Sequence, residues 1–294
     1  MKKKKNEIKL FCEFVIPPML IWASIVVIPL IYGIYLTFTN WNGLSPNYDL
    51  VGFSNYAAIF TDKTFLSSLW KTFVYVFFVV VFSNVLGLAL ALLLTYGIKL
   101  QGLFRTCFFA ANMIGGVVMG YIWNYIFSFA LTKVGAVTGW GLFQKSWLTS
   151  PGTALVALIV VAVWQLSGYL MVIYVAGLTN VSKDMLEAAK IDGATIIQQI
   201  RNVELPALKP VIVIQFILSA GNIMSIGFEK VYAMQTDLNK ITSDIIPTYV
   251  YRLGLEMGDY GYSTAVGLFN SIVNLILLVA VNYVVSKLNE GEGL

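Results

Sequence analysis

Residues 72–97 read T-F-V-Y-V-F-F-V-V-V-F-S-N-V-L-G-L-A-L-A-L-L-L-T-Y-G, and the nearest charged side chains are Lys71 on one side and Lys99 on the other. About 20 consecutive apolar residues in an α-helix cross the hydrocarbon core of a bilayer, so this stretch predicts a membrane-spanning helix. The composition of the whole chain agrees, because 58% of its 294 residues are hydrophobic and 12% are charged. Ordinary soluble domains carry about 25% charged residues.

Long charge-free gaps of this kind recur along the chain. An ionisable group inside the hydrocarbon is costly, so such gaps mark the helices that cross the membrane. The sequence therefore predicts an all-α integral membrane protein with six transmembrane helices, near Phe14–Phe38, Thr72–Gly97, Leu103–Phe127, Thr153–Gly177, Lys209–Phe228 and Ser263–Ser286. In the third stretch, Gly116 and Gly120 form a G-x-x-x-G spacing, which we interpret as close helix packing within the chain.

The orientation follows from the unequal distribution of Lys and Arg between the two sides of this map. One side carries 12 of the 19 basic residues, namely Lys2, Lys3, Lys4, Lys5, Lys9, Lys99, Arg105, Lys183, Lys190, Arg201, Lys209 and Lys287. We expect that side to be cytoplasmic. The map then has a cytoplasmic N-terminal tail (1–13), a transmembrane domain (14–287) and a cytoplasmic C-terminal tail (288–294). A signal peptide is the alternative for the start, but the apolar stretch is long and contains three prolines.

Several classes of protein are disfavoured by what the sequence lacks. There is no histidine, and the two cysteines, Cys12 and Cys107, lie in or beside apolar stretches. We therefore expect no metal site, no disulfide framework and no His-dependent catalytic triad, so the chain is not expected to be an enzyme. No G-x-x-x-x-G-K-[ST] motif is present to hold ATP. A secondary transporter is also disfavoured, because the predicted spans contain no Asp, Glu, Lys or Arg away from their ends that could serve ion coupling.

The stretch between the fourth and fifth spans is unusually rich in charge. Residues 183–209 read K-D-M-L-E-A-A-K-I-D-G-A-T-I-I-Q-Q-I-R-N-V-E-L-P-A-L-K. The pattern predicts a short helix over residues 184–191, a break at Gly193, and a second helix over residues 194–203 that Pro206 ends. In the second helix we expect one apolar side, formed by Ile196, Ile197, Ile200 and Val203. Such a helix pair fits a groove on a partner protein or the lipid headgroups equally well.

The spacing of this stretch resembles a known family. Glu187-Ala188-Ala189, then Gly193 after three residues and Val203-Glu204-Leu205-Pro206 after nine more, are similar to the EAA signature of binding-protein-dependent ABC importer permeases. That signature is E-A-A-x3-G-x9-I-x-L-P, and Val203 stands where Ile is usual. Three further stretches are similar to the sugar-transporting branch of the family: Phe38–Gly43, Val51–Tyr56 and Trp164–Leu178.

The resemblance implies the type I ABC importer fold with a cytoplasmic coupling loop. In such permeases the two short helices sit in a cleft of the ATP-binding subunit, where Glu187 would pair with an arginine. Gly193 would supply the turn between the helices. The candidate coupling residues are Glu187, Ala188, Ala189, Asp192, Gly193, Leu205 and Pro206.

The same resemblance implies a set of partners and a location. They are a second homologous permease, two ATP-binding subunits that hold ATP and Mg, an extracellular solute-binding protein and membrane lipid, with no nucleic acid. The chain itself would hold no cofactor. It would be a multi-pass protein of a prokaryotic plasma membrane that moves a sugar or oligosaccharide.

The substrate stays open at this point. The chain lacks the large extracellular insertion of the maltose-transporter subunit, so it is more similar to the short-loop multiple-sugar and glycerol-phosphate permeases. The last stretch, from Thr242 through Tyr249–Arg252 to Lys287, is instead similar to permeases that import oligosaccharides derived from pectin or alginate. A glycerol-phosphate-like solute and an acidic oligosaccharide are therefore alternatives.

Amide side chains inside the predicted spans are candidates for the substrate pathway. An unpaired amide is costly in lipid, so each should face protein or water. Amides beside aromatic rings suit a neutral polyhydroxylated ligand, whereas the bland alternative is that they hold helices together. The candidate pathway residues are Asn112, Trp123, Gln165, Tyr169, Gln215, Asn222, Asn270 and Asn274.

Overall fold

The computed structural model describes residues 10–97 and 99–290, without the side chains of residues 220, 222–226, 284–286 and 288–290. In chain order after the helical start at Leu10, its elements are α2 (Ile16–Trp22), η1 (Ala23–Val27), α3 (Ile28–Leu36), α4 (Ser54–Thr61), α5 (Lys63–Thr95), α6 (Gln101–Met113), α7 (Gly116–Tyr125), η2 (Ile126–Ala130), α8 (Leu131–Thr138), η3 (Gly141–Phe143), α9 (Pro151–Thr179), α10 (Lys183–Ile191), α11 (Ile196–Gln199), η4 (Ile200–Glu204), α12 (Leu205–Ile226), α13 (Phe228–Met234), α14 (Lys240–Ser243), α15 (Ile246–Tyr251), η5 (Arg252–Glu256) and α16 (Tyr260–Glu290).

Six helical stretches among the described residues are long and apolar enough to cross a membrane. They are Leu10–Leu36, Lys63–Thr95, Gly116–Thr138, Pro151–Thr179, Ile196–Ser219 and Tyr260–Tyr283. The predicted all-α membrane fold is therefore confirmed. The chain forms two compact units, one of Met1–Lys63 with Tyr249–Ser271 and one of Thr64–Thr248 with Ile272–Leu294. They are described separately below as the smaller and the larger unit.

The third span differs from the continuous helix expected at Leu103–Phe127. The helix is interrupted at Ile114 and Gly115, which separates α6 from α7. Ile114 is extended, with φ −82° and ψ 127°, so the backbone leaves the helical conformation there. The Gly115-Gly116 pair explains why the apolar pattern alone was misleading, because glycine favours a break whatever the hydropathy of its neighbours.

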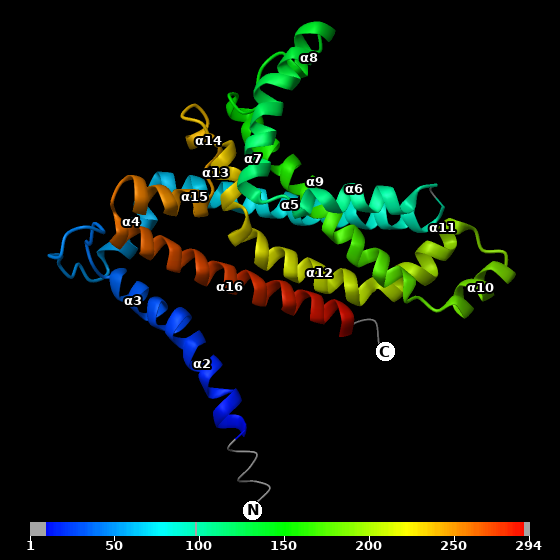
Figure 1. Ribbon diagram of the computed structural model, residues 1–294, viewed down its shortest axis with the longest axis horizontal. Coiled ribbons are helices and arrows are strands. Elements are labelled where there is room, and N and C mark those ends of the chain that lie inside the picture. The colour runs from blue at the N-terminus through cyan, green and yellow to red at the C-terminus, as the bar shows by residue number, and fades with distance from the viewer. Residues whose placement is uncertain (1–9, 98, 291–294) are drawn as a thin grey trace, which may run out of the picture. The chain divides into compact units, whose positions relative to one another are not determined.

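In the larger unit, α9 is the central helix, and α6 and α12 both pack against it (Figure 1). The approach of α6 is close, because a side chain at Gly168 on α9 would collide with the backbone carbonyl of Phe108. A core around Tyr75, Val161 and Met234 fills one part of this unit, and a second core around Leu94, Tyr174 and Leu208 fills another. In Figure 1, α8 projects away from the other helices of this unit.

The G-x-x-x-G spacing of the sequence lies where α7 packs along α13. A Cβ on Gly120 would lie 2.5 Å from the Cβ of Ala233 and 3.0 Å from the carbonyl oxygen of Lys230. A Cβ on Gly116 would collide with the carboxylate of Glu229. Close helix packing within the chain is therefore confirmed, and it holds α13 against the N-terminal end of α7.

In the smaller unit, polar side chains tie the loop after α3 to neighbouring helices. The Asn55 amide donates to the carbonyls of Thr37 and Thr39, each at 2.9 Å. Asp62 accepts hydrogen bonds from the hydroxyls of Tyr249 and Tyr262. Burial, together with the hydrogen bond to Asp62, raises the pKa of Tyr249 above its usual range, so Tyr249 stays a donor. These bonds fix a compact unit.

Candidate functional site

The coupling stretch folds as two short helices joined by a tight turn. Helix α10 ends at Ile191 with Asp192 as its C-cap, and Gly193 follows with φ +76°, a left-handed conformation that favours glycine. Thr195 then caps α11, because its hydroxyl accepts from the Gln198 N–H and the Gln198 side chain accepts from the Thr195 N–H at 2.7 Å. The expected helix, glycine turn and second helix are all present, and this reciprocal cap sets where the second helix begins.

Glu187 is exposed on α10, and the same loop also exposes several apolar side chains. Ile191 is 87% exposed, Ile197 is 76% exposed, and Met185 and Ile196 are also exposed. The expected apolar side of the second helix is thus turned outward at Ile196 and Ile197, while Gln199 is buried. Gln199 is satisfied inside, because its side-chain amide donates to the Ala194 carbonyl at 2.8 Å.

Pro206 does not end the second helix, which corrects the sequence prediction. The chain stays helical from Ile196 through Ile226, because a π-helical turn, η4, precedes α12. In this wider turn the Leu205 N–H donates to the Ile200 carbonyl, and Pro206 falls at the start of α12, where a missing N–H is tolerated. The second part of the coupling stretch, from Ile196 onward, and the fifth span therefore form one continuous helical rod.

A buried carboxylate joins this rod to the end of the second span. Glu204 is 2% exposed and forms a hydrogen bond with Tyr96, which follows α5. Burial, and then this bond, raise the pKa of Tyr96 to about 12. The second carboxylate oxygen, Oε2, is buried without a hydrogen-bond partner in the described part of the chain. The contact links two spans at their cytoplasmic ends, as the orientation above predicts them.

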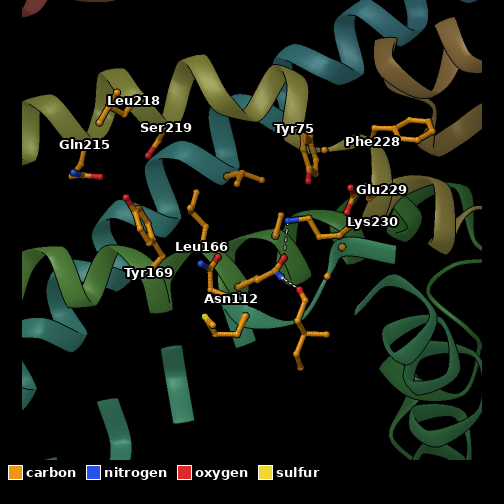
Figure 2. A pocket seen from close by; sticks show the side chains of 18 residues that line it. Tyr75, Asn112, Leu166, Tyr169, Gln215, Leu218, Ser219, Phe228, Glu229 and Lys230 are labelled. Atoms are coloured by element: carbon orange, nitrogen blue, oxygen red, sulfur yellow. Dashed lines mark hydrogen bonds between the residues drawn. The ribbon is translucent and has the colours of Figure 1, made fainter. Parts of the chain in front are cut away.

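A cavity of about 660 Å³ lies in the larger unit, between the α6–α7 break and the helices α5, α9, α12 and α13. Its volume falls within the range of about 300–1,000 Å³ that is usual for small-molecule sites. Figure 2 shows Tyr169, Gln215 and Ser219 at one end, and Tyr75, Glu229 and Lys230 at the other. The lining therefore combines aromatic rings with amides, hydroxyls and one pair of opposite charges.

Gln165 connects three elements at the wall of this cavity. Its Nε2 donates to the Ala111 carbonyl at 3.1 Å and the Ile114 carbonyl at 3.2 Å, which the helix break leaves without intrahelical donors. Its Oε1 accepts from the Lys230 ammonium at 2.8 Å. Gln165 is therefore committed to holding the break, and the irregular backbone is tolerated because it lines a cavity.

Three other polar groups in the lining are free for a ligand. Tyr75, Gln215 and Ser219 are 2%, 7% and 5% exposed. None of their side chains has a hydrogen-bond partner among the described residues. Their polar atoms do not count among the fully buried, unpartnered atoms of the described residues, so a ligand or water in the cavity can reach and hydrogen-bond them.

Lys230 and Glu229 line the cavity, although the sequence map places them beyond the fifth span as loop residues. Burial lowers the pKa of Lys230 to about 8, and the nearby Glu229 carboxylate opposes that shift. The signal in the sequence that could have identified them is an acidic residue next to a basic one directly after an apolar stretch. We assigned both residues to a loop and used them only to mark the end of the fifth span and to orient the chain.

Half of the predicted pathway residues line this cavity, namely Asn112, Gln165, Tyr169 and Gln215. Trp123 instead packs against Phe127 and Trp164. Asn274 donates to the Gly221 carbonyl at 3.4 Å, which is the helix-joining role. Asn270 belongs to the smaller unit, where its Oδ1 is buried without a partner among the described residues. The side chain of Asn222 lies outside the described residues.

Comparison with known proteins identifies the family to which the chain belongs. The sequence profile of "Binding-protein-dependent transport system inner membrane component" matches residues 83–290. The probable starch degradation products transport system permease protein AmyD of Thermoanaerobacterium thermosulfurigenes is 31% identical over 273 residues, with 92% of this chain and 90% of the relative covered. The multiple sugar-binding transport system permease protein MsmF of Streptococcus mutans is 30% identical over 260 residues, with 88% and 89% covered.

The fold is also found among solved structures. A chain of a bacterial ABC transporter involved in the import of the acidic polysaccharide alginate superposes with a TM-score of 0.84 at 24% identity. The match covers 97% of this chain and 98% of that one. At this identity the likeness concerns the fold alone.

Proposed function

The chain belongs to the family of inner membrane components of binding-protein-dependent transport systems, and on that premise we propose that it is the permease subunit of an ATP-driven importer for a sugar or oligosaccharide. The names of AmyD and MsmF, which refer to starch degradation products and multiple sugars, support a carbohydrate substrate. The chain provides the pathway, and partner subunits supply the energy.

The cavity of the larger unit is the observation that carries this proposal. It combines the rings of Tyr75 and Tyr169 with the buried, unpartnered side chains of Gln215 and Ser219. A sugar presents hydroxyls to hydrogen-bonding groups and apolar ring faces to aromatic side chains. A glycerol-phosphate-like solute is less suited, because its dianionic phosphate would meet a single cation, Lys230, with Glu229 beside it.

The coupling stretch supports an ATP-binding partner. Glu187 is exposed on α10, which the Gly193 turn joins to the helical rod that runs from Ile196 into α12. A loop that exposes this carboxylate together with Ile191, Ile197 and Met185 suits a groove that offers an arginine and an apolar floor. Movement of that partner would pass along the rod toward the cavity lining at Gln215.

The proposed assembly contains this chain, a second related permease, two ATP-binding subunits and an extracellular binding protein. This multi-pass membrane protein would lie in the plasma membrane with both termini in the cytoplasm. ATP and Mg would bind to the partner subunits alone.

The test is uptake by the complete complex in proteoliposomes, with its binding protein outside and a radiolabelled sugar that this protein binds. We expect uptake only when ATP is enclosed with the ATP-binding subunits. Uptake driven by an ion gradient without ATP would instead show a secondary transporter and contradict the proposal.

A further inference from the structure

The cavity of the larger unit contains one cation and one anion in an otherwise uncharged lining. Of its lining residues, only Lys230 and Glu229 are charged. They are consecutive in α13, and in the described part of the chain neither forms an ion pair. The lining therefore has no net charge. Both the ammonium and the carboxylate can still form hydrogen bonds with a ligand.

A hydrogen bond to Gln165 holds the Lys230 side chain at the cavity. One of its three N–H groups donates to Gln165, which is itself anchored to two carbonyls of the α6–α7 break. The remaining donors are available to a ligand. With a pKa of about 8, lowered by burial, Lys230 is largely protonated at neutral pH.

Glu229 is positioned from the opposite direction. Its carboxylate lies against Gly116, at the start of α7, where any Cβ would collide with it. Its side chain lines the cavity and is exposed rather than enclosed. Figure 2 shows Glu229 beside Lys230 and opposite Gln215.

We propose that this cavity binds an uncharged sugar unit, with Lys230 donating to one hydroxyl and Glu229 accepting from another. The inference rests on the proposed function and adds the charge class of the substrate. A hydroxyl can both donate and accept, so two hydroxyls of one sugar ring satisfy both charges. Gln215, Ser219 and Tyr75 would bind the remaining hydroxyls.

A sugar that carries a carboxylate fits this lining less well. Its negative charge would gain one charge-assisted bond from Lys230 but would stand close to the Glu229 carboxylate. A single ammonium cannot neutralise two carboxylates, so one negative charge would lack a cationic partner in the cavity. Repulsion from the Glu229 carboxylate would therefore select against sugars that carry a carboxylate.

The experiment measures equilibrium binding of radiolabelled tetrasaccharides to the purified complete complex without its binding protein. The probes are maltotetraose, cellotetraose, tetragalacturonate and the fully methyl-esterified, uncharged form of tetragalacturonate. Variants are Glu229→Gln, which removes the anion at nearly constant shape, and Lys230→Met. Lys133→Met, at an exposed residue of α8 outside the cavity, is the matched control for loss of a lysine.

We expect a neutral tetrasaccharide to bind wild type and tetragalacturonate to bind about tenfold or more weakly than its ester, which corresponds to about 1.4 kcal/mol. Glu229→Gln should reduce that difference, Lys230→Met should abolish neutral binding, and Lys133→Met should match wild type. Equal or tighter binding of the acid would overturn the inference. So would the absence of neutral binding, or a preference that neither cavity variant alters. If ATP-driven uptake persists in those cases, the proposed function stands and only the inference fails.

Discussion

At the scale of single residues, Gly193 is the position where the coupling stretch depends most on backbone conformation. Its φ of +76° costs a residue with a Cβ about 1–2 kcal/mol. A Cβ there would meet nothing within 4 Å, so the cost is conformational rather than steric. We expect Gly193→Val to redirect α11 and lower both uptake and substrate-stimulated ATP hydrolysis by the assembled complex.

Gly193→Asn is the matched variant, because Asn adopts left-handed φ more readily than a β-branched residue. It should keep most of the coupling that Gly193→Val loses. Equal activity of the two variants and wild type would mean that this turn does not transmit force. The EAA spacing predicted the glycine turn, and the structure confirms its positive φ.

The charge of Lys230 predicts a dependence on pH. Its pKa of about 8 is below the usual value for lysine because of burial, so the cation is present at pH 7 and lost as pH rises to 9. Loss of the cation leaves Glu229 unbalanced, and binding of a neutral tetrasaccharide should weaken across this range. The other titratable groups lining the cavity are Glu229, Tyr75 and Tyr169.

The variant Lys230→Arg distinguishes titration of Lys230 from titration of those other groups, because arginine stays protonated from pH 7 to pH 9. Binding measured by equilibrium dialysis should then vary little between pH 7 and 9. A wild-type profile retained in Lys230→Arg would assign the titration to another group.

At the scale of elements, the contact of α7 with α13 fixes one wall of the cavity. A Cβ on Gly120 would be 2.5 Å from Ala233 and 3.0 Å from the Lys230 carbonyl, and neither atom can rotate away. Overpacking of this kind costs about 1–3 kcal/mol. Gly120→Ala should therefore lower the thermal unfolding midpoint of the detergent-purified chain.

Gly102→Ala on α6 is the control, since a Cβ there meets nothing within 4 Å. It should match or slightly exceed wild type, because alanine favours the helix. A Gly120→Ala variant as stable as Gly102→Ala would show that the two helices can separate without cost.

The elements show where sequence reasoning succeeds and where it stops. Apolar length predicts spans well, because lipid imposes a length on any helix that crosses it. The break between α6 and α7 was missed, since it depends on Gln165 reaching the Ala111 and Ile114 carbonyls from a helix more than 50 residues away in sequence. Such tertiary compensation leaves no periodic signal beyond the Gly115-Gly116 pair.

At the scale of the whole molecule, the distribution of basic residues predicts both termini in the cytoplasm. Single cysteines introduced at Lys133 and Lys240 of a chain without its native cysteines should react with a membrane-impermeant maleimide added outside intact cells. Cysteines at Lys190 should react only after lysis. Reaction of the first two only after lysis would reverse the orientation.

Only some of the predicted pathway residues line the cavity of the larger unit. Amides in apolar stretches can line a cavity or bond a neighbouring helix, and periodicity does not separate the two uses. Gln215 lines the cavity, whereas Asn274 bonds the Gly221 carbonyl. Lys230 and Glu229 also line the cavity, but their charges led us to assign them to a loop.

The central claim, that the cavity of this chain is part of the sugar pathway, is tested most directly by uptake into proteoliposomes that contain the complete importer. The variant is Gln215→Leu with Asn112→Leu, which removes two lining amides and leaves the coupling stretch unchanged. Loss of hydrogen bonds at two positions predicts a fall in uptake of about tenfold or more. The complex should still assemble and hydrolyse ATP without sugar at the wild-type rate. Wild-type uptake by this variant would contradict the account.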